Sequence, residues 1–350
     1  MKARQIISIA LIALLVFSLV YVGCTNNQEK PPKVDVKPAQ PKTEVKAPEF
    51  IADTAFQFIE KQVSFGPRVP NSESHSKCGD WIVNKMKQYG ASVTEQKTTL
   101  KAFDGTMLNV RNIIAAFFPE NKSRILLCAH WDTRPFADKD PNKSNWNKPI
   151  DGANDGGSGV GVLMEIARQI SLKAPSIGID FIFFDAEDYG TPEFRDEKNN
   201  NILNDRFISS WCLGSQYFAL NPHVKQYNPR YGILLDMVAS SDARFNKERF
   251  SSESAPDVLN LVWNTAAKLG YEQYFLDEEV EAVTDDHVML NRAGYRVIDI
   301  IDTRPQPMAM GLGGYVFGGY HHTHNDNMSL IDKNTLKAVG QTLLQVVYNQ

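Results

Sequence analysis

Short apolar runs alternate with segments of helical periodicity over most of the 350-residue chain. Apolar residues three and four positions apart predict helices with one buried face, and short apolar runs between turn signals predict buried strands. Helices are predicted over residues 51–65, 71–89, 158–172, 211–220, 256–269 and 333–348. Strands are predicted over residues 93–101, 105–118, 124–128, 179–184, 231–238 and 295–301. This alternation predicts one three-layer α/β/α domain around a central, twisted, mostly parallel sheet.

The N-terminal segment has the pattern of an export signal. Lys2 and Arg4 give it a basic start, and residues 6–22 are almost wholly apolar. Residues 21–24, Tyr-Val-Gly-Cys, resemble a bacterial lipobox, in which Cys24 is lipidated and becomes the mature N-terminus. An uncleaved membrane anchor is the alternative. Both interpretations predict a periplasm-facing protein anchored to the inner or the outer membrane.

The next segment is rich in Pro, Lys, Gln and Asn and has almost no large apolar residue. Such a composition cannot bury enough surface to order itself. The predicted organisation is therefore a lipoprotein signal peptide over residues 1–23, a flexible Pro- and Lys-rich tether over residues 24–49, and one folded, catalytic body over residues 50–350.

Composition and charge narrow the class of protein. The chain is 43% hydrophobic and 22% charged with a net charge of -4, which is an ordinary balance for a large globular domain. It has no dense cluster of Lys and Arg, so no nucleic-acid partner is expected. The four cysteines show no Cys-x-x-Cys spacing, which argues against a cysteine zinc site. A disulfide between Cys78 and Cys212 stays open at this stage.

Four short polar segments carry the candidate chemistry. They are Ala-His-Trp-Asp (129–132), Asp-Gly-Ala-Asn-Asp (151–155), Phe-Asp-Ala-Glu-Asp (184–188) and His-His-Thr-His-Asn-Asp-Asn (321–327). The first and third segments directly follow predicted buried strands. Open α/β sheets bind ligands at the carboxyl ends of their strands, and zinc takes nitrogen and oxygen ligands. The segments therefore predict one metal site assembled from distant parts of the chain.

Glu187 and Asp188 are adjacent acids at the end of a buried strand. Neighbouring carboxylates repel unless a cation lies between them or one of them is protonated. A metal beside Asp188 and a proton on Glu187 would satisfy both conditions, which suggests one ligand and one acid/base. A solvated junction between a strand and a loop is the alternative.

Other acids stand in positions where an unpaired charge is costly. Asp236 and Asp299 lie inside apolar strands, so each needs a metal, a proton or hydrogen bonds. Asp155 precedes a Gly-Gly turn and a helix, where an ordinary capping aspartate is the alternative. Asp285 opens a predicted helix, and acids favour that position for dipole reasons alone.

Three of the seven histidines, His321, His322 and His324, fall within four positions. At least one of them is expected to bind metal. A serine nucleophile is not supported, because Ser158 follows the glycines where a helix begins and is better suited to capping. A phosphate-binding loop is also absent, since no Gly-Lys-Ser/Thr follows those glycines.

The order of these motifs resembles a known family. Ala-His-Trp-Asp, Asp-Gly-Ala-Asn-Asp, Phe-Phe-Asp-Ala-Glu-Asp, Leu-Leu-Asp-Met, Asp-Asp-His and His-His-Thr-x-x-Asp-Asn follow one another as in zinc exopeptidases of the aminopeptidase type. The chain most closely resembles the glutaminyl cyclases built on that fold, from about residue 50 to its end. The resemblance implies conversion of an N-terminal Gln of peptides and proteins to pyroglutamate with release of ammonia.

The resemblance also implies roles for single residues. One zinc ion would be held by Asp155, Asp188 and His322. Glu187 would carry the proton from the α-amine to the departing ammonia. Asp236 and Asp285 would join a hydrogen-bond network around the reacting groups. Trp211 lies near a segment similar to the family's but is not aligned to a pocket tryptophan.

Departures from the family pattern keep other functions open. Asp188 stands where many relatives have Glu, and His321 stands where animal cyclases have Trp. His130 is present and, with Asp236, could complete a second zinc site, as in two-zinc aminopeptidases. Hydrolysis of N-terminal residues is therefore the alternative activity. A binding module that has lost its chemistry is a third hypothesis, which the retained buried carboxylates disfavour.

Overall fold

The computed structural model describes residues 45–195, 209–307 and 313–350. The predicted signal peptide (1–23) and most of the predicted tether (24–49) lie outside the described residues. Within the described ranges, no helix is both long enough and apolar enough to cross a membrane.

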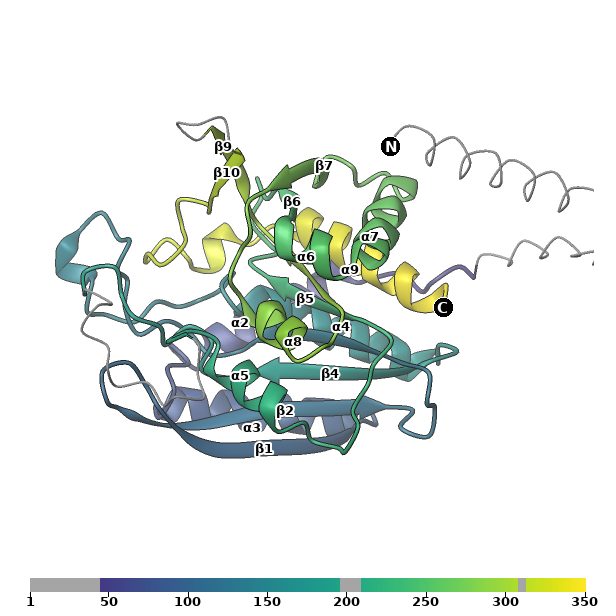
Figure 1. Ribbon diagram of the computed structural model, residues 1–350, viewed down its shortest axis with the longest axis horizontal. Helices are drawn as coiled ribbons and strands as arrows, with labels where there is room; N and C mark the ends of the chain where they lie inside the picture. The colour runs from purple at the N-terminus through teal and green to yellow at the C-terminus, as the bar shows by residue number, and fades with distance from the viewer. Residues whose placement is uncertain (1–44, 196–208, 308–312) are drawn as a thin grey trace, which may run out of the picture. The chain divides into compact units, whose positions relative to one another are not determined.

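A six-stranded sheet forms the centre of the body (Figure 1). In spatial order its strands are β1 (Ser92–Lys101), β2 (Met107–Phe117), β4 (Gly178–Phe184), β3 (Arg124–His130), β5 (Gly232–Asp236) and β8 (Val297–Ile301). β4, β3, β5 and β8 run parallel to one another, whereas β2 is antiparallel to both β1 and β4. The predicted α/β fold with a mostly parallel central sheet is confirmed.

Helices cover both faces of this sheet. The described helices are α2 (Ala52–Val63), α3 (Glu73–Gln88), α4 (Gly157–Leu172), α5 (Leu213–Leu220), α6 (Arg249–Ser254), α7 (Pro256–Lys268), α8 (Asp286–Arg292) and α9 (Lys333–Tyr348). In β3, Ile125 and Leu127 pack into the larger core with α2, α4, α7 and α9, whereas Leu126 packs into a smaller core with α5 and α8. Because successive strand side chains alternate between the two faces, both faces must be apolar, which explains the continuous apolar runs.

Two small sheets were not predicted from the sequence. β6 (Phe245–Glu248) pairs in parallel with β7 (Phe275–Val280), and β9 (Arg304–Pro307) pairs with β10 (Gly313–Val316) in antiparallel fashion. Their strands are short and mix polar with apolar residues, so they lack the period that predicts a strand.

The body begins before residue 50. Ala47 and Phe50 are buried, and the Ala47 amide donates to Gln345 Oε1 at 3.3 Å. Gln341 of α9 donates to the Pro48 carbonyl at 3.0 Å. Residues 45–49, which the composition assigned to the tether, are therefore docked along α9.

Candidate active site

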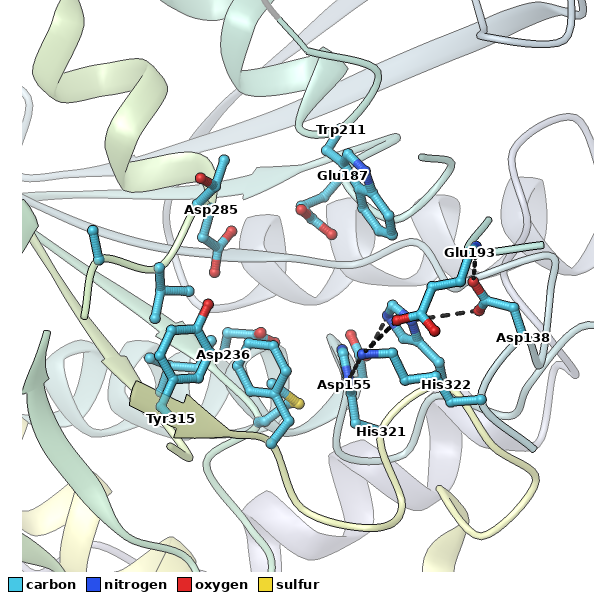
Figure 2. Close-up of a pocket in the computed structure, with 17 residues that line it drawn as sticks. Asp138, Asp155, Glu187, Glu193, Trp211, Asp236, Asp285, Tyr315, His321 and His322 are labelled. Carbon is cyan, nitrogen blue, oxygen red and sulfur yellow. Dashed lines mark hydrogen bonds and ion pairs between the residues drawn. The ribbon is translucent and has the colours of Figure 1, made fainter. Parts of the chain in front are cut away.

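A pocket of about 270 Å³ lies beyond the carboxyl ends of the parallel strands. The structure brings together there five of the six residues predicted for the site, which line the pocket as Asp155, Glu187, Asp236, Asp285 and His322 (Figure 2). The sixth, Asp188, contacts His322. The pocket thus gathers residues from β5, from the turns after β4 and before α4 and α8, and from the loop between β10 and α9.

The structure brings the three predicted metal ligands, Asp155, Asp188 and His322, together in one group, called the metal cluster below. His322 Nε2 lies 3.3 Å from Asp188 Oδ1 and 3.7 Å from Asp155 Oδ2. Asp188 Oδ2 is buried and has no hydrogen-bond partner among the described residues. Burial and the charge of Asp155 raise the pKa of Asp188, because a second buried carboxylate without a cation is unfavourable. Two carboxylates and one imidazole are a donor set for catalytic zinc, so these residues fit the metal.

Asp155 is held by the backbone around it. Gly156 has a positive φ of 45° and precedes α4, and a Cβ there would lie 2.7 Å from the His130 carbonyl oxygen. The Asp326 carboxylate accepts hydrogen bonds from the amides of Asn154 at 2.7 Å and Asp155 at 3.0 Å. These contacts leave the Asp155 side chain free to point at the cluster.

The predicted capping role of Ser158 is wrong. Gly156 precedes the first turn of α4, and Ser158 lies inside that turn. Its hydroxyl donates to the Asn154 carbonyl at 2.6 Å and accepts from the Val238 amide at 2.9 Å. Ser158 therefore ties the Asp155 loop to the end of β5 rather than capping the helix.

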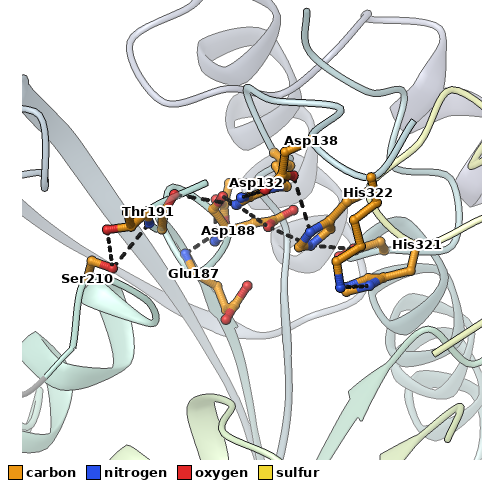
Figure 3. Close-up of polar contacts among 12 residues, drawn as sticks. Asp132, Asp138, Glu187, Asp188, Thr191, Ser210, His321 and His322 are labelled. Atoms are coloured by element: carbon orange, nitrogen blue, oxygen red, sulfur yellow. Dashed lines mark hydrogen bonds and ion pairs between the residues drawn. The ribbon is translucent and has the colours of Figure 1, made fainter. Parts of the chain in front are cut away.

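A second carboxylate holds the Glu187–Asp188 pair. Asp132 accepts hydrogen bonds from the amides of Glu187 at 3.1 Å and Asp188 at 3.2 Å (Figure 3). Ala186, just before the pair, has a positive φ of 54°. This turn places Glu187 on the pocket wall while Asp188 contacts His322. The backbone conformation therefore directs the two adjacent side chains to different places, Glu187 to the pocket and Asp188 to His322.

Asp155 also faces a second cluster. His130 Nε2 lies 3.1 Å from Asp155 Oδ1 and 3.2 Å from Asp236 Oδ1. Burial, followed by the charge of Asp155, raises the pKa of Asp236 to about 7. Burial opposes ionisation of Asp155, but the hydrogen bond to His130 and the charges of His130, His322 and Arg134 together outweigh it and lower the pKa of Asp155. All five residues of a two-metal arrangement are therefore in place, with Asp155 between the two clusters.

Glu187 has the environment of a proton carrier. Burial, followed by the charge of Asp285, raises the pKa of Glu187 well above its ordinary value. No direct hydrogen bond joins Glu187 to Asp236 or Asp285 among the described residues, so charge rather than a closed network links them. Asp285 accepts from the Asp286 amide at 2.5 Å and caps α8, which confirms the predicted helix start.

His322 is fixed by Trp211 and by two residues that the sequence did not single out, Asp138 and Arg134. The Trp211 ring stacks on it with 5.7 Å between centroids and 6° between planes. Asp138 Oδ1 lies 3.5 Å from His322 Nδ1, and Arg134 binds Asp138 through two hydrogen bonds of 2.6 and 2.7 Å. The Arg134 guanidinium also lies 4.4 Å from the Trp211 ring centroid. Such outer contacts fix the orientation of a ligating imidazole.

Two of the three clustered histidines, His321 and His322, line the pocket with 3.6 Å between their ring centroids, and His324 lies apart. His322 belongs to the metal cluster, and His321 lies beside it and accepts a contact of 3.2 Å from Lys139. His324 contacts Asp140 at 3.2 Å and the Pro149 carbonyl at 3.1 Å, away from the pocket lining. His321 and His322 form, with Asp155, a group whose ligand atoms lie within 4.8 Å of one another, so two of the three histidines can contribute to a metal site, in agreement with the expectation of at least one.

Four further residues resolve questions that the sequence left open. Cys78 and Cys212 are both free, buried thiols, so the disulfide considered above is not formed. Asp299 is fully buried and lies 3.7 Å from His287 Nδ1, outside the pocket lining. Trp211, which could not be aligned, lines the pocket.

Comparison with known proteins assigns the family. The model of peptidase family M28 matches residues 112–347. The chain belongs to peptidase family M28. Among curated proteins, the aminopeptidase YwaD of Bacillus subtilis is 26% identical over 294 residues, covering 81% of this chain and 54% of the aminopeptidase. The chain thus spans about half the length of that M28 relative.

Solved structures of bacterial glutaminyl cyclases are more similar to this M28 chain. The Bacteroides thetaiotaomicron glutaminyl cyclase bound to N-acetylhistamine is 50% identical with a TM-score of 0.79, covering 87% of this chain and 99% of the cyclase. The Tannerella forsythia glutaminyl cyclase is 50% identical with a TM-score of 0.80, covering 87% of this chain and 100% of the cyclase. The resemblance read from the motifs is therefore confirmed over nearly the whole body.

Proposed function

We propose that the chain is a zinc-dependent glutaminyl-peptide cyclotransferase, an acyltransferase that converts an N-terminal Gln to pyroglutamate. The observation that carries this proposal is that the buried Glu187 lines the same pocket as Asp155 and His322, two of the three predicted zinc ligands. The close similarity to solved glutaminyl cyclases supports the same activity. The substrates are peptides and proteins that begin with Gln.

Asp155, Asp188 and His322 would hold one zinc ion, which would polarise the side-chain carbonyl of the substrate Gln when bound. Glu187, as a carboxylate, accepts a proton from the substrate α-amine. The α-nitrogen then bonds to the side-chain carbonyl carbon, and the bond from that carbon to the amide nitrogen breaks. Glu187 returns the proton to the departing ammonia, so the enzyme ends unchanged.

The raised pKa of Glu187 suits this task. A base that holds its proton more firmly than an ordinary carboxylate takes it more readily from an amine and is still able to release it. Asp236 and Asp285 line the same pocket and present acceptors to the α-amine and the leaving nitrogen. Their place on the wall agrees with the positioning role implied by the resemblance.

Hydrolysis by a two-zinc aminopeptidase is the second candidate, because His130, Asp155 and Asp236 form a further cluster. The purified protein should be incubated with a Gln-initiated peptide and its products followed by mass spectrometry. Loss of ammonia from an otherwise intact peptide is the expected result. Release of the first residue as a free amino acid would instead establish the aminopeptidase.

Metal analysis of the same purified protein gives the number of zinc ions per chain. A cyclase needs no activated water, so one zinc ion per chain is expected. A matched peptide that begins with Ala tests for hydrolysis directly, since it cannot cyclise. Two zinc ions per chain together with cleavage of the Ala peptide would overturn the cyclase proposal.

We further propose that the protein is an exported lipoprotein anchored through Cys24. The apolar segment and the lipobox-like residues 21–24 support this, and the tether would let the body stand off the membrane. The unmodified protein should incorporate a labelled fatty acid, and Cys24→Ser, which has no thiol to modify, should not. An unmodified protein that is in the membrane fraction but carries no label would favour the uncleaved anchor.

A further inference from the structure

Cys212 lies against the proposed proton carrier, and the reaction outlined above gives this thiol no part. Its Sγ is 3.1 Å from Glu187 Oε1, and its side chain is fully buried. We infer that Cys212 is a positioning residue, whose thiol fixes one oxygen of Glu187 so that the other oxygen, Oε2, exchanges the proton. The inference rests on the proposed function of Glu187.

The backbone brings the two residues together independently of the thiol. The Cys212 amide donates to the Glu187 carbonyl at 2.9 Å, and the Leu213 amide donates to the Ala186 carbonyl at 3.0 Å. Ala186 and Cys212 have positive φ values of 54° and 59°. Non-glycine residues rarely adopt this conformation, and it persists where surrounding contacts over-determine it. The turn after β4 and the start of α5 are therefore locked to each other.

The thiol lies next to both pocket acids, because Cys212 Sγ and one carboxylate oxygen each of Glu187 and Asp285 lie within 4.8 Å of one another. Described residues lining the pocket include Glu187 but not Cys212. Figure 2 shows the Glu187 carboxylate on the pocket wall, facing the carboxylate of Asp285. The thiol contacts Oε1, and among the described contacts Oε2 accepts no hydrogen bond from the protein. The arrangement thus assigns different tasks to the two oxygens.

The same turn is connected to the other wall of the pocket. The Ser215 hydroxyl oxygen lies 3.1 Å from the Cys212 carbonyl oxygen and 2.5 Å from Asp286 Oδ1, so it is within hydrogen-bond distance of both. Asp286 follows Asp285, which lines the pocket. The contact of Cys212 with Glu187 therefore belongs to a rigid unit that sets the spacing of both acids.

A reactive role for the thiol does not fit its surroundings. Burial, followed by the charge of Glu187, raises the pKa of Cys212 well above its ordinary value. A thiol kept protonated is a poor nucleophile but a steady hydrogen-bond donor. Hydrogen bonds to charged acceptors are stronger than neutral ones, so the contact can hold a carboxylate rotamer.

The test compares Cys212→Ala, which removes the donor, with Cys212→Ser, which keeps a short one. On a Gln-initiated peptide, Cys212→Ala should lower kcat by about tenfold to a hundredfold, the usual effect of losing a hydrogen bond to a charged group. KM should stay unchanged because the thiol does not line the pocket. Cys212→Ser should recover most of the lost kcat. Zinc content and melting temperature should match those of the unmodified protein.

Cys78→Ala is the matched control, since Cys78 is also a free, fully buried thiol but lies in α3. It should leave kcat unchanged. The inference is overturned if Cys212→Ala keeps the original kcat. It is also overturned if the Ala and Ser variants lose kcat equally while both stay folded and zinc-loaded.

An infrared measurement separates this inference from the proposed function. The S–H stretching band that disappears in Cys212→Ala should lie below the Cys78 band, because a thiol that donates to a carboxylate has a weakened S–H bond. In Glu187→Gln the Cys212 band should move toward the Cys78 band. Coinciding bands in the unmodified protein would refute the contact even if no cyclisation were detected.

Discussion

At the scale of single residues, the acids of the pocket differ in what they touch. Asp155 and Asp188 share the imidazole of His322, whereas Glu187 touches the thiol of Cys212. The side chains proposed to hold zinc and the side chain proposed to carry the proton are therefore different ones, although Glu187 and Asp188 are neighbours in the chain. This separation makes the roles open to independent tests.

Glu187→Gln should abolish turnover while leaving zinc bound. The amide cannot take up the α-amine proton, and loss of an acid/base group typically costs about 10²–10⁴-fold in kcat. Kinetics on a Gln-initiated peptide and zinc analysis of the same sample measure both effects. Glu120→Gln, at an exposed position, is the control and should behave as the unmodified protein. Retained turnover in Glu187→Gln would mean that the acid/base assignment is wrong.

At the scale of elements, the predicted zinc ligands lie on loops, and hydrogen bonds to buried carboxylates fix the conformation of these loops. The Asp326 carboxylate accepts hydrogen bonds from two backbone amides of the loop before α4, and the Asp132 carboxylate accepts two from the turn after β4. Both contacts join segments that are far apart in the chain. The metal cluster is therefore positioned by cross-links between loops as well as by the ends of strands.

Asp326→Asn should weaken zinc binding. Asparagine offers one good acceptor where the carboxylate offers two, so one buried amide of the Asp155 loop loses its partner. Removal of such an outer contact typically costs about 10–100-fold in metal affinity. Competition with a chelator measures the change. Asp332→Asn alters a carboxylate that caps α9 through two amides, and it should lower stability without changing zinc affinity.

Glu248, the N-cap residue of α6, is expected to make the stability of the fold fall in acid. Glu248 accepts from the amides of Phe250 at 2.8 Å and Val283 at 3.2 Å and contacts His287 at 3.1 Å. Burial opposes its ionisation, but the hydrogen bond and charge of His287 outweigh burial and lower the pKa of Glu248. The folded protein therefore binds fewer protons at this site than the unfolded chain.

Glu248→Gln should cost about 1–3 kcal/mol at neutral pH, because it removes hydrogen bonds to a buried charged group. The stabilisation by Glu248 is complete above the unfolded pKa of about 4.3 and is lost as pH falls through the lower folded value. Urea unfolding across pH should therefore show the two proteins converging in acid. A constant difference at all pH values would contradict this account.

At the scale of the whole molecule, the sheet gathers its chemistry at one end. β3, β4 and β5 are parallel, so His130, the turn carrying Glu187, and Asp236 meet at the same edge. Zinc bound there would join segments from residue 155 to residue 322, which cross most of the body. The metal should then stabilise the entire fold and not only the pocket.

Removal of zinc with a chelator should abolish activity and lower the melting temperature. A ligand that binds only the folded state stabilises it by roughly 4 kcal/mol when its concentration is a thousandfold above its Kd. Calorimetry with and without added zinc measures the shift. His322→Ala, which lacks one ligand of the cluster, should show a much smaller zinc-dependent shift.

Much of this architecture follows from the sequence. The buried strands correspond to apolar runs in the sequence, and the residues of the metal cluster are aspartates and a histidine in motifs whose order matches the family. Cys212, Arg134 and Asp138 could not be assigned because each acts through a partner that only folding supplies. The contact of Cys212 with Glu187, for example, spans 25 positions and depends on two left-handed turns. Residues 45–49 are too polar to predict burial, and α9 supplies the side chains that bind them.

Because residues 45–49 pack along α9, the position of a proteolytic cut determines whether the packing of the body stays intact. Phe50 is fully buried, and a side chain at Gly340 of α9 would collide with its ring. Proteolysis before residue 45 leaves this contact complete and releases the body whole. Proteolysis after Phe50 removes an aromatic side chain from the core and strips partners from two glutamines of α9. A truncated form of the protein is therefore expected to be stable only if it keeps residues 45–50.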